Sequence, residues 1–202
     1  MDPERTAVVL IGYQNDYFAA DGVLSQVIEE SSRVTGNLAH TVDLLQRLYP
    51  SPILVVATPI VFTPDYRELI EPVGILKTVK ELRAFRAETK GAETIPELRR
   101  FGQRIIEVPG KRGLNAFSNT DLDSLLRSRG IANVVLAGVV TSVCVDSTGR
   151  SAYERGYKVT ILSDCTSGRT SFEQDFYCEH IFPLYAEVID HVELLKRLEV
   201  LV

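Results

Sequence analysis

Short apolar runs alternate along the chain with segments whose apolar residues recur every three or four positions. The runs, such as TAVVLI at 6–11, have the length of buried strands, and the recurring pattern is typical of amphipathic helices. Strands are therefore predicted over residues 6–11, 53–57, 104–108, 133–140, 158–162 and 186–189. Helices are predicted over 31–49, 95–101, 120–130, 144–155, 171–182 and 191–199.

This alternation predicts an α/β fold, because parallel strands are joined by crossover helices. Helices on both faces of the sheet account for strand runs such as VVLAGVV at 134–140, which do not alternate with polar residues. No shift in composition and no repeat divides the chain, so one domain over 1–202 is expected. Residues 58–93 hold several Pro and Gly and are expected to form a long loop with short helical pieces. Loops of this length are often functional lids.

Composition and charge exclude several classes of partner. The 202 residues carry 22 Lys and Arg against 27 Asp and Glu, a net charge of −5, which does not favour nucleic acid. The longest apolar run, Val134 to Val140, is far shorter than the ~20 residues that span a bilayer. Three cysteines, an odd number without paired spacing, indicate a reducing compartment, so a cytoplasmic location is expected. The expected partner is a small-molecule substrate.

Ligands of parallel α/β sheets bind at the carboxyl ends of the strands, and Cys144 is the strongest candidate there. It follows the most apolar strand and opens a predicted helix. The positive end of a helix favours the thiolate form of cysteine, and the free N–H groups there can hold an oxyanion. The alternative is that Cys144 is an inert buried residue, as most free cysteines are. Cys165 and Cys178 are expected to be structural.

Lys111 also follows a predicted strand, between two glycines. A lysine in a site can stabilise a neighbouring thiolate, although a solvated loop lysine is the commoner case. The histidines His40, His180 and His191 and the cysteines show no metal-ligand spacing, so no metal is expected. Glycine-rich phosphate-binding motifs are also missing from the sequence, so no cofactor is expected.

Three segments together resemble the isochorismatase-like cysteine hydrolase superfamily, which includes nicotinamidases and N-carbamoylsarcosine amidohydrolases. They are AVVLIGYQNDYF at 7–18, GKRGLNAFSNTDLDSLL at 110–126 and VVLAGVVTSVCVDSTGRSAYERGYKVTILSDCTS at 134–167. The third segment is long and specific, whereas the first alone is a weak signal.

The resemblance implies a Rossmann-like, three-layer α-β-α fold with a six-stranded parallel sheet in the order 3-2-1-4-5-6. It implies that Cys144 is the nucleophile of a covalent intermediate and that Lys111 is its catalytic partner. It further implies a cis peptide bond between Val139 and Val140, with the N–H groups of Val140 and Cys144 as the oxyanion hole. Members of the superfamily commonly form homodimers or homotetramers.

One departure from the family pattern concerns the acid of its Asp-Lys-Cys triad. The position of that Asp is Gly12 here, which can neither take nor deliver a proton. Asp16 matches a second, usually structural Asp, and Asp65 in the lid is a speculative replacement. The remaining residues that match supporting or substrate-binding positions are Gln14, Asn115, which stands where many members have Ser, and Thr141. Residues 58–63 lack the histidines of the family members that bind a metal.

Three hypotheses follow from this pattern. The first is a working cysteine hydrolase that acts on a small amide, ureido or related C–N carbonyl compound. The second is a catalytically impaired protein that uses the same scaffold as a small-molecule binding or regulatory module. The third is a dead site in which Cys144 is merely packed. The intact flanks of Cys144 and Lys111 favour the first hypothesis.

Overall fold

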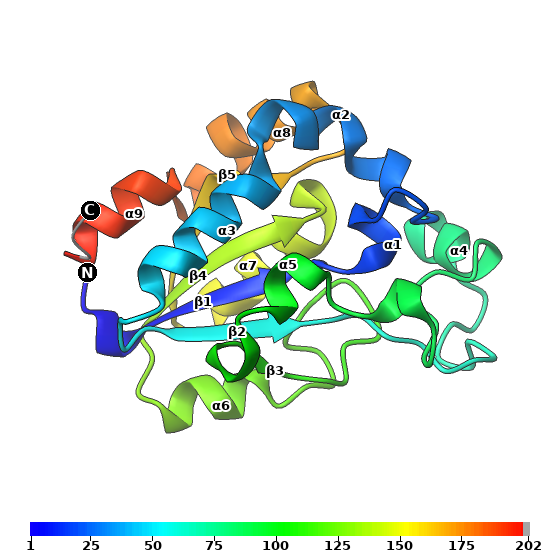
Figure 1. Ribbon diagram of the computed structural model, residues 1–202, viewed down its shortest axis with the longest axis horizontal. Coiled ribbons are helices and arrows are strands. Elements are labelled where there is room, and N and C mark those ends of the chain that lie inside the picture. Colours follow the sequence, from blue (N-terminus) through cyan, green and yellow to red (C-terminus); the bar gives the residue numbers. More distant parts are fainter. Residues whose placement is uncertain (200–202) are drawn as a thin grey trace.

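A parallel sheet runs through the middle of the computed structural model, which describes residues 1–199 (Figure 1). Its order is β3-β2-β1-β4-β5-β6, and every neighbouring pair is parallel. The strands are β1 Thr6–Ile11, β2 Leu54–Thr58, β3 Ile106–Glu107, β4 Asn133–Val139, β5 Lys158–Ser167 and β6 Glu187–Ile189. The predicted α/β fold and strand order are confirmed. Residues 200–202 of the expected domain lie outside the described residues.

Helices cover both faces of this sheet and make it a three-layer structure (Figure 1). Alternate residues of β1 point to opposite faces, with Val9 in one apolar cluster and Leu10 in the other. The helices packed on the Leu10 face are α3 Asn37–Leu48, α5 Pro96–Arg99 and α9 His191–Arg197. Those on the Val9 face are α6 Leu122–Ser128 and α7 Asp146–Glu154. Burial on both sides explains the strands that carry no polar alternation.

The helix predicted over 31–49 is wrong in its bounds, because the chain forms two helices there. These are α2 Ser25–Thr35 and α3, and they meet at Gly36. Gly36 has φ +62° and donates its N–H to the carbonyl of Ser32, which ends α2 in a left-handed turn that glycine favours. Val34, which the apolar periodicity placed on a buried stripe, is 71% exposed.

Other elements differ from the prediction at their ends. β3 is shorter than 104–108, and β5 continues past residue 162 to Ser167 through an irregularity in its pairing with β4. The helix predicted over 171–182 is α8 Ser171–Phe176 followed by a π-helical turn at Tyr177–Ile181. The loop that follows β1 contains α1 Asn15–Phe18, and the expected lid, residues 58–93, contains α4 Gly74–Glu81. Across residues 1–199, no helix is long and apolar enough to cross a membrane.

The carboxyl end of β4 leaves no room for a side chain beside β1. Ile11 of β1 pairs with Gly138 of β4, and a Cβ on residue 138 would lie 1.9 Å from the carbonyl oxygen of Ile11. Gly138 also has φ +134°. Only glycine therefore allows β4 to reach this point without moving β1.

We predict that Gly138→Ala destabilises the fold by more than Gly130→Ala. Gly130 also has a positive φ, +65°, but a Cβ there meets nothing within 4 Å, so that variant bears the backbone cost alone, ~1 kcal/mol. The free energies of unfolding of both variants, measured with urea, check this expectation. Equal losses in the two variants would show that the strands do not constrain residue 138.

Candidate active site

Cys144 lies in a π-helical turn, Thr141–Val145, between the carboxyl end of β4 and α7. The N–H groups of Val143 and Val145 both donate to the carbonyl of Val140, at 3.0 and 3.2 Å, and they fix the turn. The bond between Val139 and Val140 is cis, as the resemblance implies. Cys144 lies two residues before Asp146, the first residue of α7, so it does not open that helix as the sequence predicts. Its exposed fraction is only 6%.

Lys111 lies in the loop after β3, and its side chain reaches Cys144. The preceding Gly110 has φ +107°, and a Cβ there would lie 2.4 Å from the carbonyl oxygen of Asn119. The Lys111 carbonyl accepts a hydrogen bond from the Val61 N–H at 3.2 Å. The side chain is 1% exposed and its Nζ donates to Cys144 Sγ at 3.6 Å. The structure thus brings together the two residues that the sequence singled out.

A buried ammonium group is costly without a nearby anion. Within residues 1–199, Cys144 Sγ is the one hydrogen-bond acceptor of Lys111 Nζ. Lys111 thus places its side-chain nitrogen beside the thiol that the sequence singles out as the candidate nucleophile.

The other two thiols lie in less favourable surroundings. Cys165 is fully buried, and burial raises the pKa of its thiol well above the usual range. Burial also raises the pKa of Cys178 to about 12, with a further contribution from Asp175. Neither has a lysine at hydrogen-bond distance within the described part of the chain. This agrees with the expected structural role of both cysteines.

Gln14 holds the lid onto the end of β1. Its Nε2 donates to the carbonyls of Ile60 at 2.9 Å and Ala92 at 2.7 Å, and its Oε1 accepts from the Ile60 N–H at 3.0 Å. These bonds occupy the buried side-chain amide. Gln14 therefore supports the site rather than binding a substrate.

Asp16 performs a similar task further along the lid. Its Oδ2 accepts the Phe85 N–H at 2.6 Å, and Gly91 approaches so closely that a Cβ there would lie 2.2 Å from Oδ1. Burial raises the pKa of the Asp16 carboxyl, against the opposing effect of the Phe85 N–H. The carboxylate is committed to backbone contacts, as expected for the structural Asp of the family.

The space beside Gly12 is filled by neighbouring groups. Gly12 has φ +73°, and a Cβ there would lie 2.7 Å from the Val139 carbonyl oxygen and 3.6 Å from Cδ2 of Tyr17. Burial raises the pKa of the Tyr17 phenol, and the nearby charges of Cys144 and Asp16 raise it further. Sequence reasoning missed Tyr17, because nothing in its spacing shows that its ring turns back toward residue 12.

The predicted residues Asp65 and Asn115 make their hydrogen bonds with groups other than Cys144 and Lys111. Asp65 is exposed and contacts Thr63 and Arg67 at 2.8 and 3.1 Å, and these hydrogen bonds lower the pKa of its carboxyl. Asn115 Oδ1 accepts the Phe117 N–H at 2.9 Å and shapes the loop after Lys111. No contact joins Asp65 or Asn115 to the thiol within residues 1–199.

The turn that carries Cys144 is anchored by α8. Thr141 Oγ1 donates to Gln174 Oε1 at 2.6 Å, and Ser142 Oγ donates to Glu173 Oε1 at 2.5 Å. Thr141 thus supports the turn through its side chain. Gln174 and Glu173 lie in a polar stretch of sequence that gave no signal of this role.

An open cleft of about 900 Å³ borders the same turn, lined by Ser142, Val143 and residues of α7 and α8. Neither Cys144 nor Lys111 lines it. The thiol belongs to the apolar cluster on the α6–α7 face of the sheet, together with Phe117 and Val145. Ile60, Phe62 and Phe85 of the lid pack with Tyr17 and Val140 in a separate cluster.

A family model described as the isochorismatase domain matches residues 6–193. The chain belongs to the isochorismatase family. The segments 7–18, 110–126 and 134–167 fall within that match, and the expected family membership is confirmed.

Three relatives illustrate the family. The chain is 39% identical over 88 residues to an uncharacterised isochorismatase family protein, YecD of Escherichia coli O157:H7, covering 44% of this chain and 47% of that protein. It is 29% identical to the ureidoacrylate amidohydrolase RutB of Agrobacterium fabrum, over 82% of this chain and 77% of that one. A cysteine hydrolase from Pseudomonas syringae pv. phaseolicola shares the fold with a TM-score of 0.85 and 23% identity, covering 98% of this chain and 94% of that one.

We predict that a brief treatment with an alkylating reagent near neutral pH labels Cys144 before Cys165 and Cys178. The reason is the lysine at 3.6 Å from Cys144 Sγ, set against the raised pKa values of the other two thiols. Peptide mass mapping at increasing times gives the order. Earlier labelling of Cys178, which is more exposed, would show that access outweighs thiolate character.

Proposed function

We propose that this isochorismatase-family protein is a cysteine-dependent hydrolase of a small amide, ureido or related C–N carbonyl compound. The observation that carries the proposal is the buried contact between Lys111 Nζ and Cys144 Sγ, 3.6 Å apart at the carboxyl end of the sheet. The name of RutB, which denotes a ureidoacrylate amidohydrolase, supports the substrate class.

In the proposed reaction the Cys144 thiolate attacks the carbonyl carbon and forms a C–S bond, while the carbonyl π electrons move to oxygen. The N–H groups of Val140 and Cys144 are the proposed oxyanion hole. Collapse of this intermediate breaks the C–N bond, and the leaving amine takes up a proton. A water molecule then attacks the thioester, releases the acid and restores the thiolate.

The proton for the leaving amine needs a carrier, because Gly12 supplies none. Asp16 is held by the Phe85 N–H, and Asp65 is exposed and paired with Arg67. We therefore assign proton transfer to water or to the substrate itself. Loss of a general acid or base typically costs ~10²–10⁴-fold in rate, so slow turnover or a substrate with a good leaving group fits this site.

A second candidate function is a small-molecule binding or regulatory module without turnover. Two observations favour it: the glycine at the position of the family acid, and the low exposure of Cys144, 6%. Binding without hydrolysis of a panel compound would support this alternative.

We predict that Cys144→Ala abolishes hydrolysis of whichever compound in a panel of ureido acids, carbamoyl amides and simple carboxamides is turned over. The variant removes the nucleophile and fills no new space, so the fold is retained. Ammonia release measures turnover, and the intact mass of the protein after rapid quenching shows the acyl adduct on the wild type.

Cys178→Ala is the matched control, since it removes a thiol remote from Lys111, and it keeps full activity. Treatment with a metal chelator also leaves the rate unchanged, because no step uses a metal. Undiminished turnover by Cys144→Ala would overturn the covalent mechanism. No turnover by the wild type on any compound, combined with saturable binding, would favour the binding module.

We predict that Gly12→Asp lowers both stability and activity. The new side chain meets the Val139 carbonyl at 2.7 Å and must adopt φ +73°, a cost of about 1–3 kcal/mol. Thermal unfolding and turnover are measured beside Gly12→Ala, which bears the same backbone cost without a carboxylate. A gain in rate of Asp over Ala within the ~10²–10⁴-fold range of acid–base catalysis would instead show that the missing acid limits the natural protein.

A further inference from the structure

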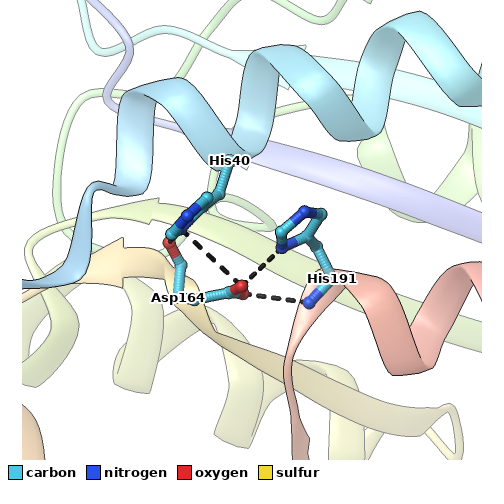
Figure 2. A group of neighbouring side chains, drawn as sticks. All are labelled: His40, Asp164 and His191. Atoms are coloured by element: carbon cyan, nitrogen blue, oxygen red, sulfur yellow. Dashed lines mark hydrogen bonds and ion pairs between the residues drawn. The ribbon is translucent and has the colours of Figure 1, made fainter.

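Two histidines and an aspartate that are far apart in the sequence meet on the α3–α9 side of the sheet (Figure 2). His40 belongs to α3, Asp164 to β5, and His191 is the first residue of α9. One ligand atom from each lies within 4.8 Å of the other two. No contact within residues 1–199 joins this cluster to Cys144 or Lys111.

His191 turns Nδ1 toward the Asp164 carboxylate, whereas His40 Nδ1 lies nearer the backbone carbonyl oxygen of Asp164, at 3.2 Å. Asp164 Oδ2 lies 2.5 Å from His191 Nδ1 and 3.7 Å from His40 Nδ1. The other oxygen, Oδ1, accepts a hydrogen bond from the backbone N–H of His191 at 3.0 Å, which fixes the orientation of the carboxylate. The rings stack with their centroids 4.9 Å apart, and Figure 2 shows the two side chains on either side of the Asp164 carboxylate.

A second carboxylate, that of Asp43, lies beside the other ring nitrogen of His191. His191 Nε2 lies 3.4 Å from Asp43 Oδ2, and Asp43 is itself held by Arg47 at 2.8 Å. A carboxylate on the far nitrogen is the usual support of a metal-binding histidine, because it fixes the ring and raises its basicity. An ordinary ion pair of His191 with Asp164 requires no such support and no second imidazole.

Exposure of the three side chains leaves an entry from solvent. His191 is 9% exposed and Asp164 21%, whereas His40 is 42% exposed. Ligands around tetrahedral zinc are about 3.4 Å apart, which lies between the two nitrogen–oxygen distances found here, so small side-chain rotations suffice.

We propose that His40, Asp164 and His191 bind a divalent transition-metal ion, with zinc as the best fit. Two imidazole nitrogens and one carboxylate oxygen suit Zn²⁺ and its neighbours and do not suit Mg²⁺ or Ca²⁺, which prefer oxygen ligands. Water completes the coordination. The bound ion joins α3, β5 and α9 and stabilises the fold, separately from the reaction at Cys144.

The sequence spacing predicts no metal, since its histidines form no recognisable motif. That expectation stays a prediction for the thiol site. The proposal for the present cluster departs from that expectation, because the ligands come from three separate elements whose convergence the sequence spacing does not show.

The experiment is a calorimetric titration of the chelator-treated, full-length protein with Zn²⁺, together with thermal unfolding with and without the ion. We expect one ion per chain and a rise in the unfolding temperature, as for any ligand that binds the folded state alone. His40→Gln and His191→Gln each weaken binding at least 10-fold and lose the thermal shift. Asp43→Asn, which removes the supporting carboxylate, weakens binding by about 10–100-fold.

Two controls separate this site from other zinc binding. His180→Gln removes an exposed histidine whose neighbour is Glu179, and it leaves the affinity unchanged. Cys144→Ser also leaves it unchanged, and Co²⁺ bound in place of zinc shows no thiolate charge-transfer absorption. His40 is largely exposed, so His40→Gln remains informative even where His191→Gln impairs folding.

Three outcomes would overturn the proposal. They are an absence of saturable binding by the wild type, affinity unchanged in both histidine variants, and loss of binding in Cys144→Ser. The last outcome would place the ion on the catalytic thiol.

Discussion

The close approach of β1 and β4 at their carboxyl ends is the constraint on which the candidate site depends. Glycines stand where the ends of the two strands meet. Gly138 of β4 lies against the Ile11 carbonyl, and Gly12, directly after β1, lies against the Val139 carbonyl. A Cβ at either position would force the strands apart. The turn that carries Cys144 starts three residues after Gly138, so its position relative to Lys111 follows from this contact.

This contact also changes how Gly12 is understood. In the sequence, Gly12 stands at the position where the family pattern has its catalytic Asp. In the structure it is a left-handed residue, packed between the Val139 carbonyl and the Tyr17 ring, that accommodates the end of β4. An aspartate at position 12 would therefore meet a backbone that leaves no room for its Cβ.

The sequence predicted the strands well where burial on both faces produces long apolar runs, as in β1 and β4. It failed where a single residue decides the geometry, as at Gly36, whose place in an apolar periodicity hid a break between two helices. The Lys111–Cys144 pair could be predicted because both residues follow strands and match family segments. The lid contacts of Gln14 and Asp16 could not, since they join side chains to backbone atoms 46 to 78 residues away. The convergence of His40 with Asp164, 124 residues later, is invisible for the same reason.

The manner in which the lid is attached has a consequence for the evolution of specificity. Gln14 and Asp16 bind only main-chain atoms of Ile60, Phe85 and Ala92, and every residue type other than proline offers these N–H and C=O groups. Exposed lid side chains can therefore change without loss of these bonds, whereas the buried Phe62 and Phe85 hold the lid through their side chains. Substitutions at exposed lid positions can thus alter the surface of this region while the main-chain bonds to Gln14 and Asp16 stay in place.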